Sequence, residues 1–143
     1  MPSLSCCYLA GLVMGFSACA SEHDLAMISR RGRERLLVGT WQSEPGDDSW
    51  IITRRADHTF TEERTVAYPQ PRTHFSSTGT WRVSGDGYYT RYTTVTHPFF
   101  ASKLVGREIR AHIWQLADGY FIFQHEDAAI ATERRVATLP RAQ

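Results

Sequence analysis

Residues 108–126 read EIRAHIWQLADGYFIFQHE, and they contain the clearest β-hairpin signal of this chain. Two runs rich in Ile, Trp and Phe flank Asp118-Gly119, a dipeptide that favours the tight turn of a two-residue hairpin. If these two residues form the whole loop, Ala117 faces Tyr120 and the register of the hairpin is fixed. The sequence therefore predicts two antiparallel strands, Glu108–Leu116 and Tyr120–Glu126.

This register divides the side chains of the hairpin between two faces. One face pairs Leu116 with Phe121, Trp114 with Phe123, His112 with His125 and Arg110 with Asp127. We assign this face to the protein interior, because its aromatic rings gain most from burial. It predicts a pocket that is apolar near the turn and polar at its far end, with six ligand-binding residues: Arg110, His112, Trp114, Phe121, Phe123 and His125. The alternative is a filled core with an Arg110–Asp127 ion pair at its rim.

The same two-residue period extends through most of the chain. Six more segments rich in Thr, Val, Ile and aromatic residues are predicted as strands: Leu37–Gln42, Ser49–Arg55, Thr59–Val66, His74–Val83, Tyr88–Val95 and Ala131–Val136. Short turns separate them, and only residues 96–107 interrupt the rhythm. The sequence thus predicts an all-β fold, a small antiparallel up-and-down barrel of about eight strands. A barrel of about seven strands, or a partly open one, is the near alternative.

Three segments carry a resemblance to a known family. Leu37-Val38-Gly39-Thr40-Trp41, Arg54-Arg55-Ala56-Asp57-His58-Thr59-Phe60 and Gly79-Thr80-Trp81 resemble motifs of the lipocalin-like (calycin) barrels. The resemblance covers residues 37–136 and implies that the Trp41 indole closes one end of the barrel. It also implies structural roles for Gly39, Gly79 and Trp81, and a late arginine, Arg134 or Arg135, that stacks on Trp41.

The N-terminal segment has the layout of an export signal. Residues 1–18 contain no Lys, Arg, Asp or Glu, and an apolar run ends at Cys19. The run resembles the bacterial lipoprotein box, which implies cleavage before Cys19, lipidation of its thiol and attachment to a membrane. Ala20 follows in place of Asp, which in such lipoproteins implies the outer membrane, facing the periplasm. An ordinary cleaved signal is the alternative.

The predicted organisation is a signal peptide over residues 1–18, a lipid-anchored tether over 19–36, a barrel over 37–136 and a tail over 137–143. In the tether, Ser21 or Asp24 is expected to cap a short helix through Leu25, Met27 and Ile28. An arginine cluster follows: Arg30, Arg31, Arg33 and Arg35. It predicts either contact with anionic lipid headgroups or a solvated linker.

Composition excludes several functional classes. The net charge of +1 gives no concentrated basic face for nucleic acid. The three cysteines, Cys6, Cys7 and Cys19, leave the predicted mature domain without a thiol pair or a cysteine-type zinc site. We expect no metal and no cofactor.

The functional expectation is a non-catalytic envelope lipoprotein whose barrel binds a small amphipathic ligand or an envelope component. The alternative is a protein-interaction module, an inhibitor or assembly factor, that recognises an envelope protein through loops such as His97-Pro98-Phe99-Phe100. An enzyme is disfavoured. Glu62 and Glu63 are adjacent on a strand and face opposite sides, which does not suit a paired-carboxylate mechanism.

Overall fold

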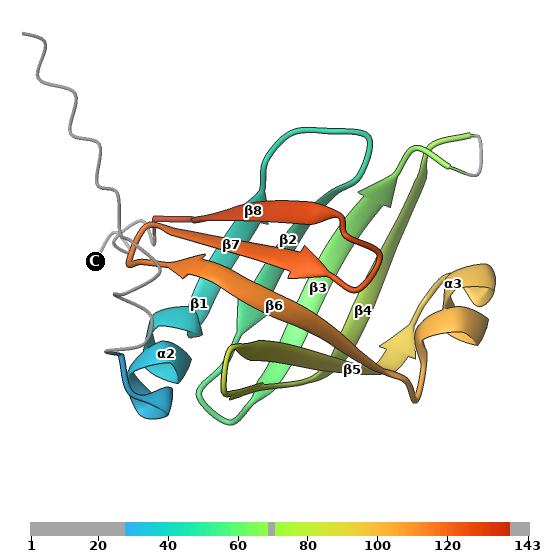
Figure 1. The fold of residues 1–143 in the computed structure, drawn as a ribbon. Helices are drawn as coiled ribbons and strands as arrows, with labels where there is room; N and C mark the ends of the chain where they lie inside the picture. Colours follow the sequence, from blue (N-terminus) through green and yellow to red (C-terminus); the bar gives the residue numbers. More distant parts are fainter. Residues whose placement is uncertain (1–27, 69–70, 138–143) are drawn as a thin grey trace, which may run out of the picture.

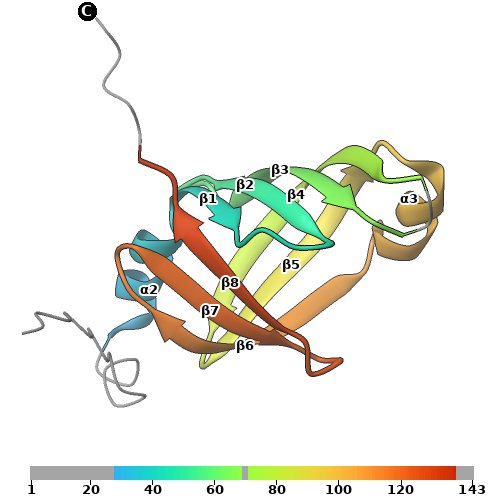
Figure 2. The ribbon, with the colours of Figure 1, turned by 90° about the horizontal axis from the view of Figure 1, so that it is seen from above.

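Eight strands form one closed antiparallel barrel (Figure 1) in the computed structural model, which describes residues 28–68 and 71–137. Each strand pairs with its neighbour in sequence and β1 also pairs with β8, which leaves no free edge among the described strands. The strands are β1 (Gly39–Ser43), β2 (Ser49–Arg54), β3 (Thr59–Val66), β4 (Thr73–Ser84), β5 (Gly87–Val95), β6 (Glu108–Leu116), β7 (Tyr120–His125) and β8 (Ile130–Arg135). Two short helices, α2 (Arg30–Leu37) and α3 (Pro98–Leu104), lie at opposite ends of the barrel (Figures 1 and 2).

The predicted all-β barrel of eight strands is confirmed. Seven of the predicted strands match the observed ones to within one residue at either end, and only β1 begins later, at Gly39. Strand β1 begins later than predicted because helix α2 continues through Leu37. The predicted signal peptide, Cys19, the helix through Leu25 and Met27, and most of the tail lie outside the described residues.

Neither helix was anticipated at its observed place. Helix α2 lies inside the segment predicted as a tether, and the Ser29 side chain caps it by accepting a hydrogen bond from the Gly32 N–H at 3.2 Å. Helix α3 lies within residues 96–107, the segment where the sequence predicted no strand. Pro98 stands in its first turn, where the missing N–H costs no helical hydrogen bond.

Trp41 closes the barrel at the α2 end. Its indole is fully buried and its Nε1–H donates to the Leu37 carbonyl oxygen at 2.9 Å. The Arg135 guanidinium carbon lies 4.4 Å from the centre of the indole ring, and its nitrogens donate to the carbonyl oxygens of Val38 and Leu36. A side chain at Gly39 would collide with this guanidinium. The indole, the guanidinium and the glycine therefore form one interlocked end plug.

The arginine that stacks on Trp41 is Arg135, and the assignment to Arg134 is wrong. Alternate residues of β8 face the interior, so Glu133 is buried while Arg134 points into solvent and pairs with Glu44 at 3.0 Å. The other structural glycine, Gly79, lies where β4 and β5 approach each other. An added Cβ there would collide with the Arg91 carbonyl oxygen and the Phe60 ring.

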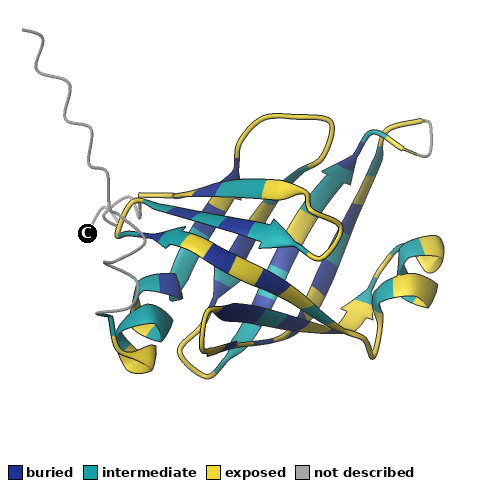
Figure 3. Cartoon of the chain, viewed as in Figure 1, coloured by how far each residue is buried: buried dark blue, intermediate teal, exposed yellow. Residues whose placement is uncertain are grey.

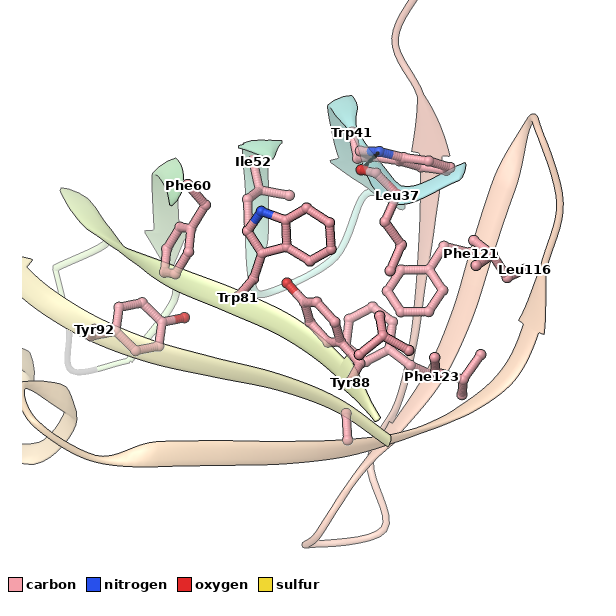
Figure 4. Close-up of a cluster of buried hydrophobic side chains, with 13 residues drawn as sticks. Leu37, Trp41, Ile52, Phe60, Trp81, Tyr88, Tyr92, Leu116, Phe121 and Phe123 are labelled. Atoms are coloured by element: carbon pink, nitrogen blue, oxygen red, sulfur yellow. Dashed lines mark hydrogen bonds between the residues drawn. The ribbon is translucent and has the colours of Figure 1, made fainter. Parts of the chain in front are cut away.

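The half of the barrel next to α2 is filled by a hydrophobic core (Figure 4). Buried and exposed residues alternate along the long strands, as Figure 3 shows for β4 and β6. Phe121 and Phe123 stack with ring centres 4.6 Å apart, and Tyr88 meets Phe121 edge to face at 5.4 Å. The Trp81 indole is buried and donates to the carbonyl oxygens of Arg55 and Thr59, both at 3.2 Å.

The predicted register of the β6–β7 hairpin holds only next to its turn. Leu116 pairs with Phe121 as predicted, but a β-bulge at Trp114 places Ile113 opposite Phe123. From the bulge onward the inward face of β6 is Ile113 and Ala111. The predicted pairs Trp114–Phe123 and His112–His125 are therefore wrong, because one extra residue in a strand transfers the following side chains to the other face.

Candidate functional site

The end of the barrel away from α2 holds a cavity of about 650 Å³ that opens to solvent. The β1–β2 loop, the β7–β8 loop and the last turn of α3 all contribute residues to its lining. Its lining consists of Ser43, Glu44, Asp48, Trp50, Arg64, Thr90, Tyr92, Leu104, Ile109, His125, Glu126, Asp127, Ala129, Ile130, Ala131 and Thr132. We call this cavity the cup.

The cup has a mixed lining, in which polar and charged residues outnumber the apolar ones. Trp50, Ile109, Leu104 and Ala131 supply hydrophobic surface from four different elements. Several inward polar side chains share the wall: Ser43, Arg64, Thr90, Tyr92 and His125. Carboxylates stand on the loops at the mouth: Glu44, Asp48, Glu126 and Asp127. A concavity that combines apolar surface with convergent polar groups suits an amphipathic small molecule.

A buried ion pair lies deeper in the barrel than the cup. Arg54 Nη1 donates to Glu133 Oε2 at 2.7 Å and Nη2 donates to Oε1 at 3.1 Å, and both side chains are about 1% exposed. Trp50, a lining residue of the cup, donates its Nε1–H to Glu133 Oε1 at 2.8 Å. The Tyr88 hydroxyl oxygen accepts from Arg54 Nε at 2.8 Å. This network links β2, β5 and β8 and fixes the Trp50 ring.

The network keeps Arg54 charged at neutral pH. Burial alone would lower the pKa of the Arg54 guanidinium, but the facing Glu133 carboxylate and the Tyr88 hydroxyl outweigh it and raise this pKa. Burial raises the pKa of the Tyr88 phenol to about 12. Burial likewise raises the pKa of Tyr92 well above its ordinary value, and Glu62 raises it further.

Stability is expected to fall in alkaline solution because of these tyrosines. Above about pH 10 a tyrosine of the unfolded chain loses its proton while Tyr88 in the fold retains it, so each rise in pH favours unfolding. The raised pKa of Tyr88, about 12 against 10.0, corresponds to a loss of about 3 kcal/mol once the pH has passed both values.

Urea unfolding between about pH 9 and about pH 12 measures this decline. Tyr88→Phe should make the decline shallower, whatever its effect at neutral pH. Tyr68→Phe is the matched control, since Tyr68 is 74% exposed, and it should leave the decline unchanged. A wild-type stability that stays constant over this range would contradict the prediction.

Glu62 forms a second buried polar group beside the cup. Its carboxylate accepts hydrogen bonds from the Ser77 hydroxyl at 2.8 Å and the Tyr92 hydroxyl at 3.2 Å. Glu62 is 5% exposed whereas Glu63 is exposed on the outer face, as the strand alternation predicts. His125 lies on the far wall, where burial and then the charge of Arg64 lower the pKa of its imidazole. The His125 ring therefore faces the cup uncharged at neutral pH.

The six predicted ligand-binding residues do not share one pocket. Arg110, His112 and Trp114 lie on the outer surface, where Arg110 and His112 approach Asp86 at 3.6 and 3.1 Å. Arg110 is thus on the opposite face of β6 from its predicted place, and its ion pair is with Asp86. Phe121 and Phe123 belong to the filled core, and only His125 lines the cup.

The charged residues of the interior were missed by the sequence analysis. Trp50, Ile52 and Arg54 alternate along β2, and Phe60, Glu62 and Arg64 alternate along β3. Arg54, Glu62 and Arg64 thus occupy positions of their strands that point inward. The alternation of side chains along β2 and β3 could have identified them from the sequence. A charge at a position that the pattern assigns to the interior indicates either a functional or a paired residue.

Comparison of the sequence with models of protein families and with curated proteins finds no match. The structural class of the protein therefore rests on its fold and its cavity alone. It is a closed antiparallel barrel of eight strands, consistent with the calycin architecture, with one plugged end and one cup. In the described part of the chain, no helix is long and apolar enough to cross a membrane. Within residues 28–68 and 71–137, no three side chains among His, Cys, Asp and Glu form a cluster suited to a metal ion.

Proposed function

We propose that this protein binds a small amphipathic ligand in the cup. The observation that carries the proposal is the cavity of about 650 Å³. Cavities of about 300–1,000 Å³ bury most of the surface of a small organic molecule. The α2 end is plugged and the core is filled, so the cup lies at the opposite end of the barrel, and the Arg54–Glu133 network holds one of its walls rigid.

A solvatochromic dye tests the proposal without knowledge of the natural ligand. Nile red is uncharged and its fluorescence rises when it enters an apolar site, so we expect saturable enhancement with the wild-type protein. Ala131→Trp should abolish the enhancement, because Ala131 lines the cup and an indole there would occupy it. Ala56→Trp is the matched control, since Ala56 is exposed in the β2–β3 turn. Absent or non-saturable binding by the folded wild-type protein would overturn the proposal.

Binding rather than catalysis is favoured by the placement of reactive side chains. One chain of hydrogen bonds has the composition of a catalytic triad: His74 Nε2 lies 3.1 Å from Glu63, and His74 Nδ1 lies 3.2 Å from the Thr65 hydroxyl. The Glu63 and His74 side chains are 59% and 64% exposed, however, and none of the three residues lines the cup. Water screens such a surface group, which leaves it without the enclosed environment that catalysis needs.

We also propose that the protein is anchored in the bacterial cell envelope through a lipid on Cys19, with the outer membrane as its site. The support is the apolar run and the small residues before Cys19 in the sequence. Metabolic labelling with a fatty-acid analogue in a bacterial host tests it. We expect label on the wild-type chain and on Cys7→Ser, and none on Cys19→Ser. Unlabelled wild-type protein would refute the anchor.

The second candidate function, recognition of an envelope protein, rests on α3. Phe99 is 46% exposed and Val105, which follows the helix, is 44% exposed. Phe100 is not part of this surface, because it stacks on buried Phe75 with ring centres 4.6 Å apart. Phe99→Ser should therefore reduce the recovery of a partner from envelope extracts, and Tyr68→Ser, at another exposed aromatic residue, should not. Equal recovery by both variants would count against this function.

A further inference from the structure

Arg54 and Arg64 both face the barrel interior, and their hydrogen bonding differs completely. Arg54 uses all three of its nitrogens: Nε donates to Tyr88, while Nη1 and Nη2 donate to Glu133. Arg64 has no comparable partner. Its nearest carboxylate oxygens, on Asp48 and Glu62, lie 3.8 and 3.9 Å away, beyond hydrogen-bonding distance.

The guanidinium of Arg64 has N–H donors without hydrogen-bond acceptors in the described part of the chain. Its Nε is buried and has no acceptor among the described residues. The carboxylate of Glu62 is already engaged by the hydroxyls of Ser77 and Tyr92, and that of Asp48 is 52% exposed at the mouth of the cup. A guanidinium offers five N–H donors in a planar fork that fits a carboxylate. Arg64 is therefore a preformed cation whose hydrogen-bonding capacity the fold does not use.

Arg64 is also held in position. It is the cross-strand partner of Trp50, and its guanidinium carbon lies 4.9 Å from the centre of the indole ring. The Nε1–H of Trp50 is in turn fixed by Glu133. The Arg64 side chain is 24% exposed, so it is accessible from the cup but largely shielded from bulk water. A rigid, partly desolvated cation pays little entropy when it binds an anion.

The rest of the cup suits the other part of such a ligand. Ile109 and Ala131 supply apolar surface, and the uncharged ring of His125 lies on the same wall. The carboxylates at the mouth stand on exposed loops, and two of them are engaged: Glu44 with Arg134 at 3.0 Å and Asp127 with the Ala129 N–H at 3.1 Å. Solvent and salt screen these exposed charges more strongly than the interior of the cup.

We propose that Arg64 binds the carboxylate head group of the amphipathic ligand while Trp50, Ile109 and Ala131 contact its apolar part. This inference rests on the proposed function of the cup and names the chemical class of its ligand, a monocarboxylate with an apolar body. A fork of two N–H···O bonds to Arg64 replaces the long contact between Arg64 and Asp48.

Competition against Nile red tests the head group separately from the cup. Decanoate, decanol and decylamine share one apolar chain and differ in charge. We expect decanoate to displace the dye at a concentration about tenfold lower than decanol, with decylamine weakest, as a desolvated charge-assisted pair requires. In Arg64→Met, decanoate should lose this advantage over decanol, with each displacement measured against the Nile red affinity of that same variant. Arg64→Lys, which keeps the charge but not the fork, should retain part of it.

Arg91→Met is the matched control, because Arg91 is exposed on β5 outside the cup and its loss should change no displacement. Equal displacement by decanoate and decanol in the wild-type protein would overturn the role of Arg64 while leaving the cup intact. Stronger displacement by decylamine would also overturn it and would identify the carboxylates of the mouth as the determinant. Absence of Nile red binding would instead refute the proposed function itself.

Discussion

Glu133→Gln is expected to lower the free energy of unfolding by about 3–5 kcal/mol, although it changes the volume of the side chain hardly at all. Glu133 is 1% exposed and accepts three hydrogen bonds, two from Arg54 and one from Trp50. The substitution leaves the Arg54 guanidinium charged in a site from which water is excluded. The cost is the desolvation of an unpaired charge, which a neutral amide does not offset. Urea unfolding followed by tryptophan fluorescence measures it.

The fold offers a matched control for this substitution. Arg82 and Glu108 form a pair of similar geometry on the outer surface, with nitrogen–oxygen distances of 2.9 and 3.3 Å and side chains 45% and 47% exposed. Glu108→Gln should cost no more than about 1 kcal/mol, because water solvates the arginine that remains. The double variant Arg54→Met/Glu133→Leu should recover most of the loss caused by Glu133→Gln. Similar costs for the two Glu→Gln variants would show that burial does not govern the pair.

The two tryptophans Trp41 and Trp114 should differ sharply on replacement by alanine. Trp41 is fully buried, donates a hydrogen bond to Leu37 and stacks on Arg135, so Trp41→Ala should cost about 3–5 kcal/mol. Trp114 is 45% exposed at the β-bulge, and its Nε1–H donates to Gln124 on the surface. Trp114→Ala should therefore stay within about 1 kcal/mol of the wild-type stability.

This comparison also tests the register of the β6–β7 hairpin. The unbulged register would bury Trp114 opposite Phe123, and the two alanine variants would then cost similar amounts. In the bulged register Phe123 pairs with Ile113. Thermal unfolding of both variants and of Ile113→Ala distinguishes the two arrangements. We expect Ile113→Ala to cost about 2–5 kcal/mol, because Ile113 is 3% exposed in the core.

Local signals were sufficient to predict the strands and the topology. The alternation of apolar residues is a property of consecutive positions. Asp118-Gly119 forms the predicted turn, in which the Ala117 N–H donates to the Tyr120 carbonyl oxygen at 2.9 Å. Short turns between neighbouring strands then permit little besides an antiparallel meander. Helix α2 was missed because its eight residues, rich in arginine, bury only Leu37 and show no broad apolar stripe.

The candidate site was predicted less well, because it depends on one bulge and on pairs of residues far apart in sequence. The bulge at Trp114 moved Arg110, His112 and Trp114 out of the interior, and of the six predicted ligand residues only His125 lines the cup. The charges that do face inward are paired across 79 positions in Arg54–Glu133. No local pattern distinguishes such a pair from two solvated side chains.

The sequence by itself determined the strands and their order, since these follow from side-chain period and turn chemistry, whereas the roles of Gly39 and Trp41 were implied by the resemblance to calycin barrels. Only the tertiary structure decided which inward arginine is hydrogen-bonded to a carboxylate: Arg54 donates to Glu133 at 2.7 Å, whereas Arg64 approaches carboxylates only at 3.8 and 3.9 Å. The physical reason is distance. A charge–charge contact depends on ångström differences between strands, which the closure of the barrel sets and no single strand encodes.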